Sequence, residues 1–160
     1  MGVDGEYVRI MIDITNHPID ISKVMKECRD ESAGATVLFS GYIRDHNEKG
    51  RVIGIYYEAY VKMAKNILME IENEVLKKWD VKKFIAIHRI GNLTVNEISV
   101  VVGVTTEHRR EAFEACKYTI DSIKDRTPIW KKELSESGSA TWKNGLLPFH
   151  IKRNHYNENK

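Results

Sequence analysis

The sequence predicts an α+β fold, in which helices cover one side of a largely antiparallel sheet. Residues 61–79 and 108–127 repeat apolar side chains at the three- and four-residue spacing of an amphipathic helix. Residues 98–104 form a nearly continuous β-branched run, which is typical of a central strand. Strand and helix patterns follow one another in the order β-α-β-β-α-β-β-α-β, and this order indicates helices packed on a sheet.

Length and composition favour a single domain. The chain has 160 residues, 42% of them hydrophobic, which is enough for one core. A formal charge of +2 gives no reason to expect a nucleic-acid or membrane partner. The apolar runs are too short to span a bilayer, and the first residues lack a signal-peptide pattern. We therefore expect one domain over residues 1–142 and a polar, flexible tail over 143–160.

The cysteines and histidines form no metal-binding pattern. Cys28 and Cys116 are isolated and fall in helical segments, which favours a packing role in a reducing, cytoplasmic compartment. The six histidines lack metal-ligand spacing, so the sequence predicts neither a metal site nor a cofactor.

The first strand and helix are predicted from alternation and from a proline. Residues 7–14 alternate well enough for a strand. Pro18 favours a helix start, and Asp20 suits the first turn. The inward face of this helix is expected to hold Ile21, Val24, Met25 and Cys28.

Residues 34–60 are expected to form a β-hairpin with a long polar tip. Gly41, inside the first strand, indicates a bulge or a close backbone approach. Arg44 ends that strand, where it suits either an anion clamp or a surface pair with Asp45. From the residues alone, the surface pair is the favoured interpretation.

The second half of the chain continues with a core-covering helix over 61–79 and a strand over 83–90. Asn96 and Glu97 predict a turn into the central strand. Thr105 and Thr106 are expected to cap the last helix. Tyr57, Glu58 and His88 are each interpreted as structural, because Glu58 lies in mid-strand and a lone histidine at a strand end is usually a hydrogen-bonded residue.

The last helix and the strand after it carry the features that point to chemistry. Pro128 must end the helix near Thr127, and a short strand follows over 129–134. The helix's inward face is expected to hold Phe113, Cys116, Ile120 and Ile123. Cations gather around both ends: His108, Arg109, Arg110, Lys124, Arg126, Lys131 and Lys132. They suit an anionic ligand, and a lysine with a lowered pKa can act as a nucleophile, although ordinary surface charge explains most such patterns.

Five stretches of the chain also match a known family in order and spacing. They are G-A-x-V-L-F-x-G-x-x-R at 34–44, Y-E-A-Y at 57–60, M-A at 63–64, H-R-I-G at 88–91, and, within 108–133, H-R-x-x-A-F-E-A with I-K-x-x-x-P-I-W-K-K-E. Together they resemble MoaE, the large catalytic subunit of molybdopterin synthase, over roughly residues 34–134. The resemblance implies an α/β-hammerhead-like core with an additional small antiparallel sheet.

The resemblance also implies an activity and partners. Members of this family transfer sulfur from the C-terminal thiocarboxylate of a small ubiquitin-like, MoaD-like subunit to cyclic pyranopterin monophosphate, or precursor Z. The product is the dithiolene of molybdopterin. The expected assembly is a heterotetramer around a homodimer, and the small subunit's tail would thread into a pocket of this chain.

The resemblance implies a set of site residues. Lys124 is implied to meet the thiocarboxylate, by stabilising its acyl group or forming an adduct with it. Lys131 is implied to act as an acid–base partner or charge stabiliser when the cyclic phosphate opens. The substrate-binding set comprises Tyr42, Ile43, Arg44, His108, Arg109, Lys124, Lys131, Lys132 and Glu133.

Strand alternation refines this set. Ile129, Lys131 and Glu133 share the face expected to meet the pocket, and Trp130 and Leu134 share the face expected to meet the core. Lys132 then faces away from the pocket. The chain departs from the family after Trp142, where members can carry a further basic residue. Either Lys143 replaces that residue, or the tail contributes nothing.

Two other classes of function remain open from the residues. One is a non-catalytic module that binds a phosphorylated small molecule. The other is an enzyme whose lysine forms a Schiff base with a carbonyl substrate.

Helix geometry predicts that the site is shared between subunits. Sixteen residues at a rise of about 1.5 Å separate His108 from Lys124 by roughly 24 Å, and sixteen steps of about 100° place them on nearly opposite faces. We therefore expect Arg44, Lys124, Lys131 and Glu133 from one subunit, and His108 and Arg109 from its two-fold mate.

Overall fold

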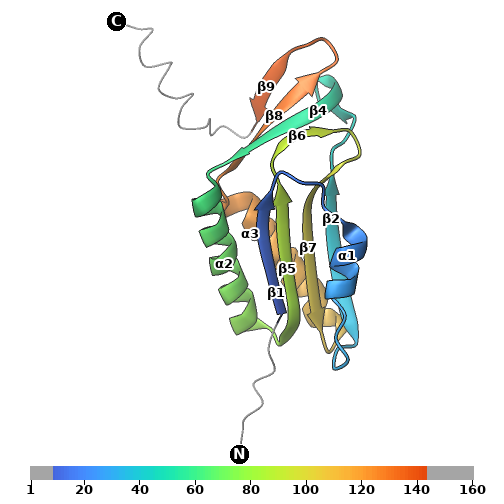
Figure 1. Cartoon of the computed structure of the whole chain (residues 1–160), viewed down its shortest axis with the longest axis vertical. Helices are drawn as coiled ribbons and strands as arrows, with labels where there is room; N and C mark the ends of the chain where they lie inside the picture. The colour runs from blue at the N-terminus through green and yellow to red at the C-terminus, as the bar shows by residue number, and fades with distance from the viewer. Residues whose placement is uncertain (1–8, 144–160) are drawn as a thin grey trace, which may run out of the picture.

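The computed structural model describes residues 9–143 and confirms the α+β class (Figure 1). Its helices are α1 (Ile21–Glu27), α2 (Val61–Lys78) and α3 (Arg109–Arg126). Its strands are β1 (Arg9–Thr15), β2 (Ala35–Tyr42), β3 (His46–Asn47), β4 (Gly50–Ala59), β5 (Val81–Arg89), β6 (Gly91–Thr94), β7 (Ile98–Thr106), β8 (Ile129–Ser135) and β9 (Ala140–Lys143). The short strands β3, β6 and β9 were not predicted.

The first sheet has four strands, in the order β1-β5-β7-β2. Strand β7 pairs antiparallel with both β5 and β2, which confirms it as a central strand. Strand β1 pairs parallel with β5, so the sheet is mixed. The predicted bulge is present, because the β2–β7 register shifts between Gly41 and Tyr42.

The three helices cover both faces of this sheet, not one as expected. On one face, α2 and α3 pack against Phe84, Ala86, Val102 and Val104. On the other face, Val24 of α1 and Cys28 after it pack against Ile85, Ile87 and Val101. Gly103 permits this close approach, because a Cβ there would lie 2.8 Å from Cys28 Sγ. Figure 1 shows α1 on the opposite side from α2 and α3.

The predicted hairpin over residues 34–60 is wrong, because its two strands belong to different sheets. Strand β2 pairs with β7, whereas β4 pairs with β8 and β6 in the second sheet, of order β3-β4-β8-β9. The chain leaves the first sheet after the bulge and forms only the short β3–β4 hairpin. Strands adjacent in sequence usually pair, but β2 and β4 both pair with strands that are distant in sequence.

Some packing predictions also need correction. Phe113 is 62% exposed and Met25 48% exposed, because the inward face of each helix is centred elsewhere. In α3 that face carries small residues, Ala112 and Ala115, which let the helix lie close to the sheet. Thr105 and Thr106 lie within β7 and do not cap α3, whose N-cap residue is His108.

The C-terminal boundary differs slightly from the expected one. Lys143, placed in the expected tail, ends β9, and residues 144–160 lie outside the described part of the chain. None of the helices between residues 9 and 143 is long and apolar enough to cross a membrane.

Candidate active site

A pocket opens where the end of α3 meets both sheets. Its volume is about 140 Å³. Lys124 of α3 and Lys131 of β8 both line it. The remaining lining residues come from α3, from four strands and from the α3–β8 connection: Tyr57, His88, Ser99, Val100, Ile120, Ile123, Thr127 and Ile129. None of these described lining residues carries a carboxylate.

Local sequence places the two lysines in this pocket. Thr127 is the C-cap of α3 with an extended backbone, as required before Pro128, so Lys124 lies in the last turn of the helix. The chain then enters β8, where alternation brings Ile129 and Lys131 to the pocket side. Tyr57 of β4 is the direct cross-strand partner of Lys131 and lines the same pocket.

Burial and charge together perturb Lys131. Burial is the largest influence and lowers the pKa of Lys131. The positive charges of Lys124, Arg44 and Lys143 act in the same direction, and Glu133 opposes them. A lysine in this environment has an increased neutral fraction, which suits a nucleophile or a proton acceptor.

Tyr57, His88, Ser99 and Thr127 form what we call the inner wall of the pocket, which is polar but uncharged near neutral pH. His88 is buried, and this burial lowers its pKa to about 4. Its Nδ1 lies 2.7 Å from the Arg89 carbonyl oxygen and donates to it, so Nε2 is the acceptor of the neutral ring. Tyr57 meets the His88 ring edge-on at 5.1 Å between centroids, and burial raises the pKa of Tyr57. The buried Thr127 hydroxyl has no hydrogen-bond partner among the described residues, so it can bind a ligand.

Glu133 lies beside this pocket and lines a neighbouring cavity of about 120 Å³. Its Oε2 accepts a hydrogen bond from Asn47 Nδ2 and lies 3.8 Å from Lys143 Nζ. The Glu133 side chain is 12% exposed. The Glu133 carboxylate is therefore held by two groups from outside β8.

The predicted substrate-binding residues at the end of β2 and just after it lie in different environments. Ile43 is buried in a small cluster with Val52, Ile55 and Leu93, so its side chain is not available to a ligand. Tyr42 is 54% exposed. Arg44 is exposed, and its positive charge lowers the pKa of Lys131. This effect is consistent with a position of Arg44 at the edge of the pocket.

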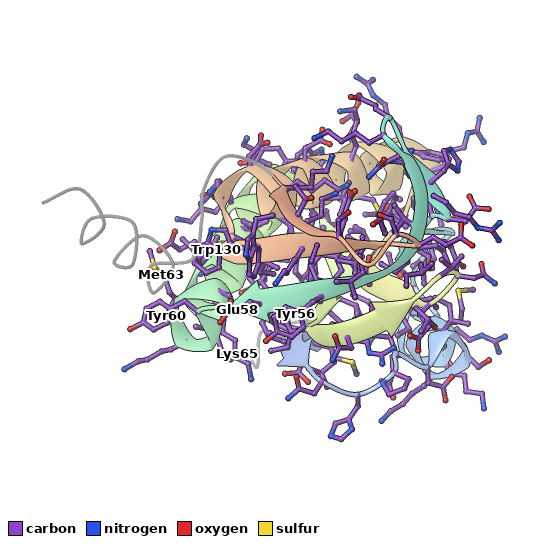
Figure 2. All side chains as sticks on the ribbon, turned by 90° about the horizontal axis from the view of Figure 1, so that it is seen from above. Tyr56, Glu58, Tyr60, Met63, Lys65 and Trp130 are labelled. Carbon is purple, nitrogen blue, oxygen red and sulfur yellow. The ribbon has the colours of Figure 1, made fainter. Side chains whose placement is uncertain are left out.

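Lys132 lies on the opposite face of β8 from the pocket. Its ammonium lies 5.5 Å from the ring centre of Trp142, so it belongs to the outer surface of the second sheet. Trp130 shares that outer face and is half-buried, so the expectation that it enters the core is wrong. Figure 2 shows Trp130 near Tyr56 and Glu58 of β4 and Tyr60 and Met63 around the start of α2.

His108 and Arg109 do not reach the lysine pocket within one chain. Helix α3 is continuous from Arg109 to Arg126, with His108 as its N-cap. Both predicted cations are exposed at the start of the helix, and Lys124 lies in its last turn. Within one subunit, His108 and Lys124 therefore lie at opposite ends of the helix, as expected from helix geometry.

Sequence reasoning missed most of the inner wall. Tyr57 and His88 were interpreted as structural, and Ser99 and Thr127 were not considered as site residues. A usable signal existed for Tyr57 and His88, because both lie within matched stretches, Y-E-A-Y and H-R-I-G. Among residues 9–143, no group of three or more His, Cys, Asp or Glu side chains is arranged to hold a metal ion.

Comparison with known proteins reveals the family. Residues 14–126 match the family model described as MoaE protein. The chain is 38% identical over 135 residues to the molybdopterin synthase catalytic subunit of Thermoplasma volcanium, covering 84% of this chain and 98% of that relative. It is similar to the molybdopterin synthase structure from Staphylococcus aureus, with a TM-score of 0.75, 33% identity, and coverage of 86% and 96%.

A third similarity concerns the fold alone. The structure of a complex of subunits 1 and 2 of molybdopterin-converting factor from Helicobacter pylori contains a chain that matches with a TM-score of 0.68. The identity is 18%, over 85% of this chain and 90% of that one.

Proposed function

This chain belongs to the MoaE family of molybdopterin synthase catalytic subunits, and from that premise we propose the reaction its pocket carries out. The chain is an enzyme of molybdenum cofactor biosynthesis. In the proposed reaction it transfers sulfur from the C-terminal thiocarboxylate of a small ubiquitin-like subunit to cyclic pyranopterin monophosphate, or precursor Z. The transfer forms the dithiolene of molybdopterin.

The observation that carries this proposal is the convergence of Lys124 and Lys131 on one small pocket. Both reactants are anions, since one carries a phosphate and the other a thiocarboxylate. A pocket with two lysines and no carboxylate among its described lining residues attracts such groups. Arg44 adds a third positive charge at the edge.

The lowered pKa of Lys131 supports its assignment to proton transfer or charge stabilisation as the cyclic phosphate opens. Lys124 then meets the incoming thiocarboxylate and stabilises its acyl group, or forms an adduct with it. The polar inner wall, with the unpartnered Thr127 hydroxyl and the His88 acceptor, supplies hydrogen bonds without a competing negative charge.

A small pocket of this kind suits a narrow protein tail. Its volume of about 140 Å³ admits small residues only, which fits an extended chain ending in glycine. The Helicobacter pylori protein of the same fold was solved as a complex of two subunits, which supports a small-subunit partner for this chain.

We further propose that two copies of this chain share each site. The continuous helix α3 keeps His108 and Arg109 away from Lys124 in one subunit, so both cations can serve the substrate only from a symmetry mate.

Reconstitution tests the proposed reaction. The purified chain is mixed with a thiocarboxylated small subunit and precursor Z, and dithiolene product is measured by its fluorescent oxidised derivative. Product should appear only when all three are present. A control with a small subunit ending in an ordinary carboxylate should yield none. Complete mixtures that yield no product would refute the proposed reaction.

A further inference from the structure

Asn47, in the short strand β3, contacts the acidic residue next to the lysine pocket. Its Nδ2 donates a hydrogen bond to Glu133 Oε2, joining the β3–β4 hairpin to β8. The two residues are 86 positions apart in the chain. Asn47 also follows Arg44 by three residues, so this contact ties the segment that carries Arg44 to the segment that carries Lys131.

The orientation of the Asn47 amide is determined by a second hydrogen bond. The backbone N–H of Lys49 donates to Asn47 Oδ1 at 2.7 Å. Only the amide oxygen can accept from an N–H group, so the amide nitrogen must face Glu133. Asn47 therefore presents a donor to the carboxylate.

The Glu133 carboxylate has other cations within reach. Lys143 Nζ lies 3.8 Å from the same oxygen that accepts from Asn47. Lys131 lies two residues earlier on the same face of β8, and Glu133 raises the pKa of Lys131 against the lowering effect of burial. The other charged or titratable groups that face Lys131 are Lys124 from α3, Arg44, Lys143 from β9, Tyr57 from β4 and His88 from β5.

We propose that Asn47 is a positioning residue, which holds the Glu133 carboxylate beside Lys131 without letting it close an ion pair with that lysine. The proposal rests on the proposed function only in giving Lys131 its chemical role. Asn47 supplies one of the donors that a largely buried carboxylate requires, so the carboxylate need not take it from Lys131. Lys131 then remains free to meet a ligand.

Removal of the amide has a definite consequence. Without Asn47, the carboxylate of Glu133, which is 12% exposed in this structure, loses a donor, and the ammonium groups on its own face of the sheet become the nearest replacements. A closer carboxylate stabilises the charged form of Lys131. The midpoint for deprotonation of Lys131 should therefore rise.

The experiment measures that midpoint directly. Full-length protein is labelled with a limiting amine-specific reagent over a series of pH values, and labelling of Lys131 is followed by mass spectrometry with fragmentation that separates it from Lys132. In Asn47→Ala, the midpoint should shift upward by at least about half a pH unit, which lowers the reactive fraction roughly threefold at a given pH below the midpoint.

A double-mutant cycle tests whether the effect passes through Glu133. In Glu133→Gln, the midpoint should fall, because the neighbouring negative charge is lost. Adding Asn47→Ala to Glu133→Gln should then change nothing further. An unchanged midpoint in Asn47→Ala alone, or the same upward shift in both backgrounds, would overturn the proposal.

Two matched variants control for damage to the turn. Asn47→Ser retains an oxygen that can accept from the Lys49 N–H but is too short to reach Glu133, so it should shift the midpoint as the alanine does. His46→Ala changes the neighbouring residue, whose ring contacts Asp45, and should leave the midpoint in place. A shift in His46→Ala as large as in Asn47→Ala would also overturn the proposal. Because labelling needs no substrate, a failed synthase reaction with the expected midpoints would count against the proposed function alone.

Discussion

Lys131 of β8 lies directly opposite Tyr57 of β4, and both side chains line the pocket that Lys124 reaches from α3. The pairing places a partly buried lysine beside a phenol whose own pKa burial raises, so neither neighbour neutralises the other near neutral pH. Glu133 lies outside the lining of this pocket, so inside the pocket a bound anion is the negative partner that Lys131 can meet.

Lys124→Ala and Lys131→Ala should each reduce sulfur transfer by at least about a hundredfold, since each removes a group that contacts the reacting atoms. Loss of a partly exposed charge usually changes the free energy of unfolding by about 0.5 kcal/mol or less. Lys132→Ala is the matched control, because Lys132 lies on the outer face of β8. Turnover within tenfold of the wild-type rate in both pocket variants would exclude a catalytic pair.

The charge of Lys124 should be visible in the titration of Lys131. Burial and the positive charge of Lys124 both lower the pKa of Lys131 from the ordinary 10.5, so neutral Lys131 begins to form at a lower pH than in a free lysine. Lys124→Gln removes one of these influences, and the labelling midpoint of Lys131 should move to higher pH. A midpoint that stays in place or falls would show that the two lysines are not electrostatically coupled.

A small subunit that lacks its last two residues should lose most of its ability to donate sulfur. The pocket lies beside β8, and an extended tail must enter it to bring the thiocarboxylate to Lys124. Product formation with full-length and truncated donors, each thiocarboxylated, provides the measurement. Equal rates would rule out threading of the tail.

Mixed dimers test the shared site. His108→Ala and Lys124→Ala should each be inactive alone, because each damages every site of a homodimer. After subunit exchange, a mixed dimer has one doubly damaged site and one intact site, so activity should reappear. Confirmed exchange with activity still at zero would assign the whole site to a single subunit.

Glu74 should contribute a pH-dependent link between α2 and α3. Its carboxylate accepts hydrogen bonds from Arg126 and Tyr118 of α3, and the Arg126 bond in particular lowers the pKa of Glu74 from 4.5 to about 2. A depressed carboxyl pKa stabilises the fold above the unfolded value and loses this effect as the pH falls from about 4.5 to 2. Glu74→Gln should therefore lower Tm at pH 7, and the difference from wild type should shrink towards pH 2. Glu70→Gln, which removes a longer and more exposed contact to Arg126, should have a smaller effect at pH 7.

Local sequence was sufficient to predict the elements that carry the two lysines. Pro128 ends α3 through its missing donor and its steric effect on Thr127, and both act between neighbouring residues. Alternation along β8 placed Lys131 and Lys132 on opposite faces, as they lie in the structure, but it wrongly assigned Trp130 to the core. The rise per residue in α3 was enough to separate His108 from Lys124.

Tertiary structure alone decided which strands pair and what forms the inner wall. Strand β2 pairs with β7, and β4 pairs with β8. Such pairings depend on backbone hydrogen bonds and on the apolar surface that the whole chain buries, and the residue types of a single segment do not determine either of them. Tyr57, His88 and Ser99 meet only because three strands from two sheets converge on the end of α3. The contact between Asn47 and Glu133 likewise joins residues 86 positions apart. It leaves no periodic trace in the sequence, because it exists only once β3 and β8 have both paired with β4.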